Sequence, residues 1–370
     1  MSTPLCPYFG SCGGCSSQHI DYSVQLENKR KLVSHHIDFE DVKVFSGKDY
    51  YYRNRMDMIF HPRGLGLREK NKWYSIIDIE QCAIANEKIN ILIKEIRLFF
   101  RSVDFYDLKK QAGTFKQVVI RAPKDETSVS FVLNEASTRL AEAIEKINEY
   151  AKISSADNIV LTYIQARSEV STSTNYFVVK GKDTLSEVLL DKKFIYNVQG
   201  FFQNNSDMAE KMLEYVNNIM KTYDTKNANL LDLYGGVGTF GITNSDLFKE
   251  VDVVENFKGS IDAANINVKE NTIKNIKTHV LDAGQISRLD LKSPLFVVTD
   301  PPRSGMDQRA IDKLKSFHPG VIVYISCNPI QLGKELLKFK NYKIKSATVF
   351  DLFPQTPHIE VVVELVSKIN

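Results

Sequence analysis

The sequence predicts an α/β protein, with a doubly wound parallel sheet in residues 197–370 and a separate α+β domain in residues 1–196. In the carboxyl-terminal part, apolar segments of strand length alternate with helical patterns. Strands joined by crossover helices form parallel sheets, whose ligands bind at the carboxyl ends of the strands. In the amino-terminal part, strand-like segments follow one another with fewer helices between them. A chain of 370 residues can form two domains with a core each.

The expected elements follow from apolar periodicity. In the carboxyl-terminal part, strands are expected at 228–233, 251–255, 277–281, 295–300, 321–326 and 343–350, and a final antiparallel strand at 359–365. Helices are expected at 262–271, 308–317 and 330–339. In the first domain, strands are expected at 115–122, 128–134, 158–165 and 175–179, with a helix at 139–151.

The composition is that of a soluble globular protein, with 25% charged and 43% hydrophobic residues. A net charge of +3 permits an RNA partner without demonstrating one. The longest apolar runs are strand-sized and too short to span a membrane. The N-terminus shows no basic and apolar leader, so we expect a cytoplasmic protein.

Four cysteines predict a metal centre. Cys6, Cys12 and Cys15 form a C-x5-C-x2-C pattern in a glycine-rich loop, and Cys82 follows a strand-like segment. Disulfides are not expected in the cytoplasm. Four sulfur ligands suit either zinc or an iron–sulfur cluster, and the spacing does not separate the two. Unconnected buried thiols are the remaining alternative.

A nucleotide-type ligand is predicted at three successive strand ends. The strand that ends near Asp232 runs into a glycine-rich turn at 234–238. Glu255, about 20 residues after the turn, is placed to bind a ribose, and Asp282 to accept from an adenine amino group. Nicotinamide enzymes share such a loop, and strand-end acids often only cap turns. The three acids together are the pattern of class I methyltransferases that use S-adenosylmethionine.

Two further strand ends carry reactive groups. Asp300 begins the stiff sequence Asp-Pro-Pro-Arg-Ser-Gly, and Cys327 ends a strand before Asn-Pro. A lone cysteine is usually a small buried hydrophobe, but this context favours a nucleophile. A thiolate that adds to carbon 6 of uracil would activate carbon 5 for methylation, and a base must then remove the carbon-5 proton. Glu360 is the best base candidate, ahead of His358.

The chain resembles the RNA 5-methyluridine methyltransferases that act on transfer or ribosomal RNA. The resemblance covers nearly the whole chain and rests on the cysteine set, the segment Phe-Phe-Gln-Asn-Asn at 201–205, the glycine loop, Asp-Pro-Pro-Arg-Ser-Gly, Ser-Cys-Asn-Pro and the residues around Glu360. It implies a 4Fe–4S cluster on Cys6, Cys12, Cys15 and Cys82, with Cys327 as nucleophile and Glu360 as base. Phe201 would stack on the flipped uracil, and Asp300 would hydrogen-bond it. The residues expected to contact S-adenosylmethionine are Gln203, Tyr234, Gly235, Gly236, Gly238, Glu255, Asp282 and Asp300.

Partners follow from the same resemblance. Many members carry an N-terminal RNA-binding β-barrel of the TRAM type, whereas five residues precede Cys6 here, so we expect the form without it. RNA contacts would then come from Arg53 and Arg55, with Arg63, Arg68 and the tyrosines at 50–52 as further candidates. A solvated surface is the alternative for these arginines.

We expect a monomer that methylates large-subunit (23S) ribosomal RNA, with uridine 54 of transfer RNA as the alternative target. Two other functions compete with this one. A methyltransferase acting on an amino nitrogen usually has an aromatic residue after Asp-Pro-Pro, where this chain has Arg303. A non-catalytic iron–sulfur RNA-binding protein would not be expected to retain Cys327 and Glu360.

Overall fold

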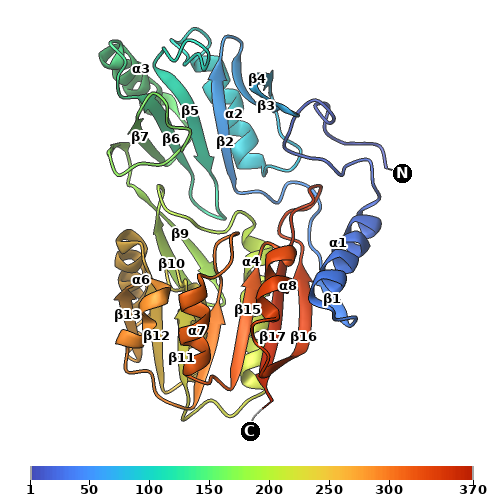
Figure 1. Ribbon diagram of the computed structural model, residues 1–370. Helices are drawn as coiled ribbons and strands as arrows, with labels where there is room; N and C mark the ends of the chain where they lie inside the picture. The colour runs from blue at the N-terminus through green and yellow to red at the C-terminus, as the bar shows by residue number, and fades with distance from the viewer. Residues whose placement is uncertain (1, 369–370) are drawn as a thin grey trace.

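The computed structural model describes residues 2–368 and contains two large sheets with helices packed against them (Figure 1). In this range the larger sheet has eight strands, in the order β1-β16-β17-β15-β14-β11-β12-β13. They are β1 (Val42–Phe45), β11 (Asn229–Leu233), β12 (Glu250–Glu255), β13 (Ile276–Val280), β14 (Leu295–Thr299), β15 (Val321–Ser326), β16 (Tyr342–Phe350) and β17 (Glu360–Ser367).

The larger sheet confirms the predicted doubly wound arrangement. Strands β11 to β15 pair in parallel, and the strand order reverses between β11 and β14. The last strand, β17, is antiparallel to both β15 and β16, as expected for the final segment. In an open sheet of this kind, ligands bind outside the carboxyl ends of the strands at the reversal point. These ends face the smaller sheet in Figure 1.

Helices cover both faces of the larger sheet because neighbouring residues of each strand point to opposite faces. Leu230 of β11 belongs to a core with α4 and α6, whereas Leu231 belongs to a core with α1, α7 and α8. The helices of this part are α1 (Tyr22–Ile37), α4 (Ser206–Lys221), α5 (Thr239–Asn244), α6 (Lys258–Glu270), α7 (Gln308–Ser316) and α8 (Pro329–Leu336), with 3-10 turns η1 (Ser245–Leu247) and η2 (Ala283–Arg288).

The smaller sheet has seven strands in the order β4-β3-β2-β5-β6-β7-β8. They are β2 (Arg55–His61), β3 (Gly64–Glu69), β4 (Lys72–Asp78), β5 (Phe115–Arg121), β6 (Ser128–Asn134), β7 (Asn158–Ile164) and β8 (Tyr176–Lys180). Helices α2 (Glu87–Phe99) and α3 (Leu140–Ile153) share one apolar core with it, in which Ile93 and Ile147 lie with Phe131. This is the α+β region that the sequence predicts.

Three segments of the predicted first domain, residues 1–196, pack with the larger sheet. The first is helix α1, whose Val33 and Ile37 lie in the core that contains Leu231. Strand β1 pairs in parallel with β16, so the amino-terminal region supplies the edge strand of the larger sheet. The hairpin β9 (Thr184–Leu189) and β10 (Lys192–Asn197) buries Leu185 and Phe194 in the core beside α4 and α6. These segments lie at or before residue 197 in the sequence but pack with the carboxyl-terminal part, because apolar side chains that are distant in sequence share one core.

No helix among residues 2–368 combines the length and the apolar character that a membrane crossing requires.

Candidate active site

The glycine-rich turn at residues 234–238 follows β11, at the point where the strand order of the larger sheet reverses. Tyr234, Gly236 and Gly238 all have positive φ, of 61°, 54° and 85°. A Cβ atom on Gly236 would meet no atom within 4 Å, so the backbone there is open to a ligand. A Cβ on Gly235 would lie 2.6 Å from Val253, so glycine is needed for close packing against β12.

Each of the three predicted strand-end acids already accepts hydrogen bonds from the backbone. Asp232 is buried and accepts from the Gly241 amide at 2.7 Å. Glu255 accepts from the amides of Phe257 at 2.9 Å and Gly236 at 3.3 Å. Asp282 accepts from Gly284 at 2.8 Å and caps η2. These carboxylates therefore cap turns, and cofactor contacts by Glu255 and Asp282 stay a prediction.

Burial in this region raises the pKa of Asp232 to about 7, with smaller contributions from the charges of Asp300 and Glu255. Burial likewise raises the pKa of Asp300 to about 7. A carboxyl group with a pKa near 7 is partly protonated at neutral pH, and its protonated form can donate a hydrogen bond as well as accept one. Asp300, at the end of β14, is thus suited to a polar ligand edge that has both donors and acceptors.

Cys327, Glu360 and Asp300 come together at the ends of adjacent strands. Cys327 follows β15, and Glu360 begins β17, which pairs with β15. Burial raises the pKa of Cys327 to about 11, and the charges of Glu360 and Asp300 contribute while Arg303 opposes them. Burial and Asp300 hold the pKa of Glu360 well above its usual value. The predicted nucleophile and base therefore share one electrostatic environment.

His358, the second base candidate, is exposed, whereas Glu360 is 5% exposed. Partial desolvation of its ring and the positive charges of Arg303, Lys29 and Arg53 lower the pKa of His358. Its ring packs edge-on against Phe353, with ring centroids 5.8 Å apart. This placement agrees better with a loop residue that has a structural partner than with a base beside Cys327.

The turn that carries Cys327 is tied to the Asp-Pro-Pro loop. The Asn328 side chain accepts from the Gln331 amide at 3.3 Å, which caps α8, and donates to the Arg303 carbonyl at 3.1 Å. Behind the loop, buried Glu335 accepts from the Met306 amide at 3.1 Å and from the Tyr324 hydroxyl at 2.5 Å. The sequence reasoning missed Glu335, whose place on α8 gave no signal of a buried partner.

The segment 201–205 lies between β10 and α4 and contacts the chain that leads into β2. Asn54 donates through its backbone amide to Asn204 at 2.9 Å and through its side chain to the Gln203 carbonyl at 3.2 Å. Gln203 is half-buried. Phe201 is 68% exposed, so its ring is free to stack on a base. The roles predicted for Gln203 and Phe201 stay predictions.

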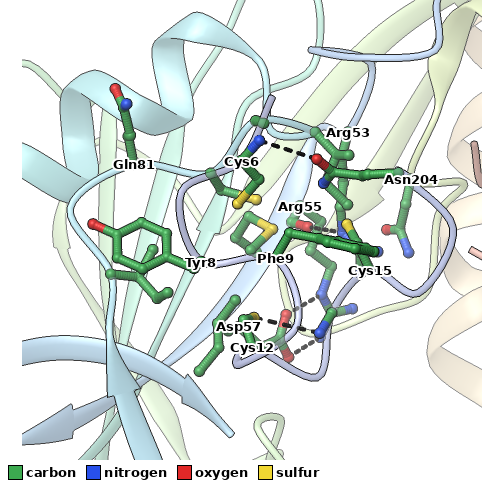
Figure 2. Close-up of a pocket in the computed structure, with 18 residues that line it drawn as sticks. Cys6, Tyr8, Phe9, Cys12, Cys15, Arg53, Arg55, Asp57, Gln81 and Asn204 are labelled. Carbon is green, nitrogen blue, oxygen red and sulfur yellow. Dashed lines mark hydrogen bonds and ion pairs between the residues drawn. The ribbon is translucent and has the colours of Figure 1, made fainter. Parts of the chain in front are cut away.

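The four cysteines line one pocket, with a volume of about 320 Å³ (Figure 2). Cys6, Cys12 and Cys15 come from the N-terminal loop, and Cys82 lies between β4 and α2. Burial, with smaller contributions from the other cysteines, raises the pKa of Cys15 to about 12 and that of Cys12 as well. Within residues 2–368 no group of three or more His, Cys, Asp and Glu side chains forms a preset site for one metal ion.

The arginines predicted to bind RNA do not all lie on an exposed surface. Arg53 and Arg55 line the cysteine pocket, and Arg55 forms a bidentate ion pair with Asp57, at 2.8 Å for both contacts (Figure 2). Arg68 bonds the Trp73 carbonyl and lies 3.4 Å from Glu169, and Arg63 is exposed. Arg55 is therefore engaged inside the protein, which weakens its case as a direct RNA contact.

The tyrosines at 50–52 also differ in their exposure to solvent. Tyr51 is 53% exposed, whereas buried Tyr52 donates to the Pro354 carbonyl at 2.9 Å. Tyr51 thus remains a candidate for a base contact, and Tyr52 has a structural partner.

Comparison with known proteins extends this picture over the whole chain. Residues 21–368 match the family described as tRNA (Uracil-5-)-methyltransferase. A tRNA (uracil(54)-C(5))-methyltransferase of Pyrococcus abyssi is 32% identical over 98% of this chain and 86% of its own length. An uncharacterized RNA methyltransferase of Caldanaerobacter subterraneus is 31% identical over 96% and 83%. The crystal structure of the P. abyssi enzyme in complex with S-adenosyl-L-homocysteine matches with a TM-score of 0.81 and 29% identity, over 96% of this chain and 86% of that chain.

The fold and the strand-end site define an S-adenosylmethionine-dependent methyltransferase with a doubly wound sheet. The match of residues 21–368, together with relatives above 30% identity along nearly the full length, is more specific. The chain belongs to the tRNA (uracil-5-)-methyltransferase family and is an RNA (uracil-C5)-methyltransferase.

Proposed function

We propose that this enzyme methylates carbon 5 of uridine 54 in transfer RNA. The single observation that carries the target is the set of relatives named for this reaction, in P. abyssi, Pyrococcus horikoshii and Pyrococcus furiosus, at 30–32% identity over nearly the whole chain. These relatives favour the transfer RNA alternative over the ribosomal RNA target that the sequence reasoning preferred.

The reaction would use the groups at the ends of β14, β15 and β17. The Cys327 thiolate adds to carbon 6 of the flipped uracil, and carbon 5 becomes carbanion-like and accepts a methyl group. S-adenosylmethionine, when bound beside the turn at 234–238, would supply that methyl group from its sulfonium sulfur and would leave as S-adenosylhomocysteine. Glu360 then removes the carbon-5 proton, and the bond between the Cys327 sulfur and carbon 6 breaks to release the product. The raised pKa of Glu360 makes it a stronger base once ionised.

Different residues would contact the flipped base, the methyl donor and the rest of the RNA. Phe201, which is exposed, would stack on the flipped base, and Asp300 would bond its polar edge. Gln203 and Tyr234 would contact the methyl donor together with the glycines of the turn. Tyr51 and Arg63 are the exposed candidates for RNA contacts from the smaller sheet.

A transcript test separates the target from other uridines. Unmodified transfer RNA with uridine at position 54 should accept one methyl group per molecule, and the same transcript with cytidine at that position should accept none. Equal methylation of both transcripts would contradict uridine 54. Methylation of only a large-subunit ribosomal RNA fragment would return the target to ribosomal RNA.

For the four cysteines we propose a 4Fe–4S cluster as the occupant of their pocket. The four thiols share one pocket that is much larger than a single ion, and they act on one another electrostatically. The thiols of Cys12, Cys15 and Cys82, whose pKa values burial raises, would stay neutral without a metal, so a cluster would also explain why they gather in one pocket with Cys6. The cluster would serve structure, because no electron is transferred in the methylation. We further propose that the enzyme is cytoplasmic and monomeric.

A further inference from the structure

The loop of residues 351–359, which connects β16 to β17 and leads to Glu360, is fixed by partners from separate parts of the chain. Four consecutive carbonyl oxygens, of residues 352–355, each accept a hydrogen bond from outside the loop. The donors are the Asn205 side chain at 3.1 Å, Lys29 Nζ at 3.1 Å, the Tyr52 hydroxyl at 2.9 Å, and the amides of Ser16 and Ser17, both at 3.1 Å. Loop carbonyls usually face water, so this loop is unusually constrained.

Gln355 is the central residue of this arrangement. It is 2% exposed and has a φ of 66°, a left-handed conformation that is unfavourable for a non-glycine residue. Its side-chain oxygen accepts from Gln25 Nε2 at 2.9 Å, and its backbone amide donates to Gln25 Oε1 at 3.2 Å. Gln25 of α1 therefore holds Gln355 by both its backbone and its side chain.

The same bonds connect the loop to the cysteines. Ser16 and Ser17, which donate to the Gln355 carbonyl, directly follow Cys15. Gln25 Nε2 also donates to the Ser17 carbonyl at 3.0 Å. Figure 1 shows the loop before β17 rising from the sheet toward the chain that precedes α1. The loop with three of the four cysteines and the loop that ends at Glu360 are thus one bonded unit.

A buried ion pair fixes the beginning of the same loop. Lys29 Nζ lies 2.6 Å from Asp351 Oδ1, and the two side chains are 5% and 0% exposed. The Tyr22 hydroxyl donates to the other oxygen of Asp351 at 2.9 Å. The beginning and the middle of the loop are therefore held from α1, and Glu360, where the loop ends, pairs with Phe350 of β16.

We propose that Gln355 is a positioning residue that holds Glu360 against the Cys327 adduct, and that the cysteine loop acts on the reaction through it. This inference rests on the proposed function, in which Glu360 removes the carbon-5 proton. It gives the cysteine loop a role in catalysis, separate from any contact with RNA. Loss of order in the loop should impair proton removal before it impairs formation of the covalent bond.

The test compares Gln355→Ala with Gln111→Ala. Gln111 is a matched control because it is exposed, has a φ of 52°, and forms a side-chain bond with Arg167 at 3.1 Å. Gln355→Ala should lower kcat on the order of 10- to 100-fold, as expected for a displaced catalytic group, with the KM for RNA unchanged. It should also accumulate a covalent RNA–protein adduct on a denaturing gel. Gln111→Ala should behave as the wild type does.

Hydrogen exchange and a double-mutant cycle test the connection to the cysteine loop. In Gln355→Ala, and not in Gln111→Ala, the amides of Ser16 and Ser17 should exchange faster. Gln25→Ala should also accumulate the covalent adduct. The variant that carries both Gln25→Ala and Gln355→Ala should lose no more activity than either single variant, because the two residues act as one unit. Gln25→Ala also replaces Gln355→Ala as the test if the latter does not fold.

The outcomes separate this inference from the function itself. If the wild type forms no 5-methyluridine, the proposed function fails. If the wild type is active and Gln355→Ala shows wild-type kcat, or loses activity without an adduct, the positioning role of Gln355 is wrong. Unchanged exchange at Ser16 and Ser17 would remove the connection to the cysteine loop.

Discussion

Cys327 and Glu360 occupy corresponding positions at the end of the antiparallel pair of β15 and β17. Ser326 pairs with Val361 in this ladder, so the next residue along each strand toward the site is Cys327 on one side and Glu360 on the other. The charge of Glu360 contributes to the raised pKa of Cys327, which agrees with their proximity. The strand register alone therefore places a thiol beside a carboxyl group.

Cys327→Ala should abolish turnover, because addition to carbon 6 needs the thiolate. The variant should also form no covalent complex with RNA that contains 5-fluorouridine, whereas the wild type should be trapped. The measurement is a denaturing gel with labelled RNA. Residual methylation by the alanine variant would show that Cys327 is not the nucleophile.

Glu360→Gln should trap the methylated RNA as a covalent adduct, because the carbon-5 proton then has no base to accept it. His358→Gln is the matched control, since His358 lies two residues away in the same segment and is exposed. It should release product at close to the wild-type rate. Rapid release by Glu360→Gln, or an adduct in His358→Gln, would assign the base elsewhere.

The rate at which Cys327 is alkylated should depend on pH in a way that its charged neighbours determine. With a pKa of about 11, its alkylation rate should rise with pH across the whole range from neutrality upward. Asp300→Asn removes a negative charge, so the rise should move to lower pH; Arg303→Ala should move it to higher pH. The Cys327 peptide is followed by mass spectrometry.

The control for this series is Arg309→Ala, since Arg309 pairs with Asp307 at 3.1 Å and does not contribute to the pKa of Cys327. If the alkylation rate of Cys327 depended on pH identically in Asp300→Asn and Arg303→Ala, these two residues would not set the pKa of Cys327 as described.

Protein purified without oxygen should be brown and contain about four irons per chain. Cys82→Ser should lower the iron content, because Cys82 supplies the ligand from outside the N-terminal loop. Iron and zinc are measured together by mass spectrometry of the metals. Zinc at one per chain with no iron would contradict the 4Fe–4S proposal.

The sequence predicted the methyltransferase sheet well because its signals are local. Strands β11, β14 and β15 are short, fully buried and mostly apolar, and Cys327 follows β15 directly. A residue at the carboxyl end of a parallel strand faces the site whatever the rest of the chain does. The alternation of strand and helix patterns therefore locates such residues even when the contacts between distant segments are unknown.

The contacts that the sequence did not reveal are those between distant segments. Strand β1 has four residues, too few for a clear pattern, and its Val42 pairs with Ala347 of β16, which lies 305 residues later in the sequence. Gln25 and Lys29 are four residues apart on α1 and are typical of an exposed helical face, yet both are buried against the loop at 351–359.

Arg55 is a different case, because a local signal was present. Arg55 and Asp57 are two residues apart in β2 and therefore share one face of the strand. An ion pair could have been expected from this spacing alone.

Methyl transfer from labelled S-adenosylmethionine to unmodified total RNA, separated into transfer and ribosomal RNA and digested to nucleosides, tests the proposed reaction and target together. We expect label in 5-methyluridine from the transfer RNA pool. Label in any other nucleoside would contradict carbon-5 methylation, and 5-methyluridine confined to ribosomal RNA would contradict the transfer RNA target.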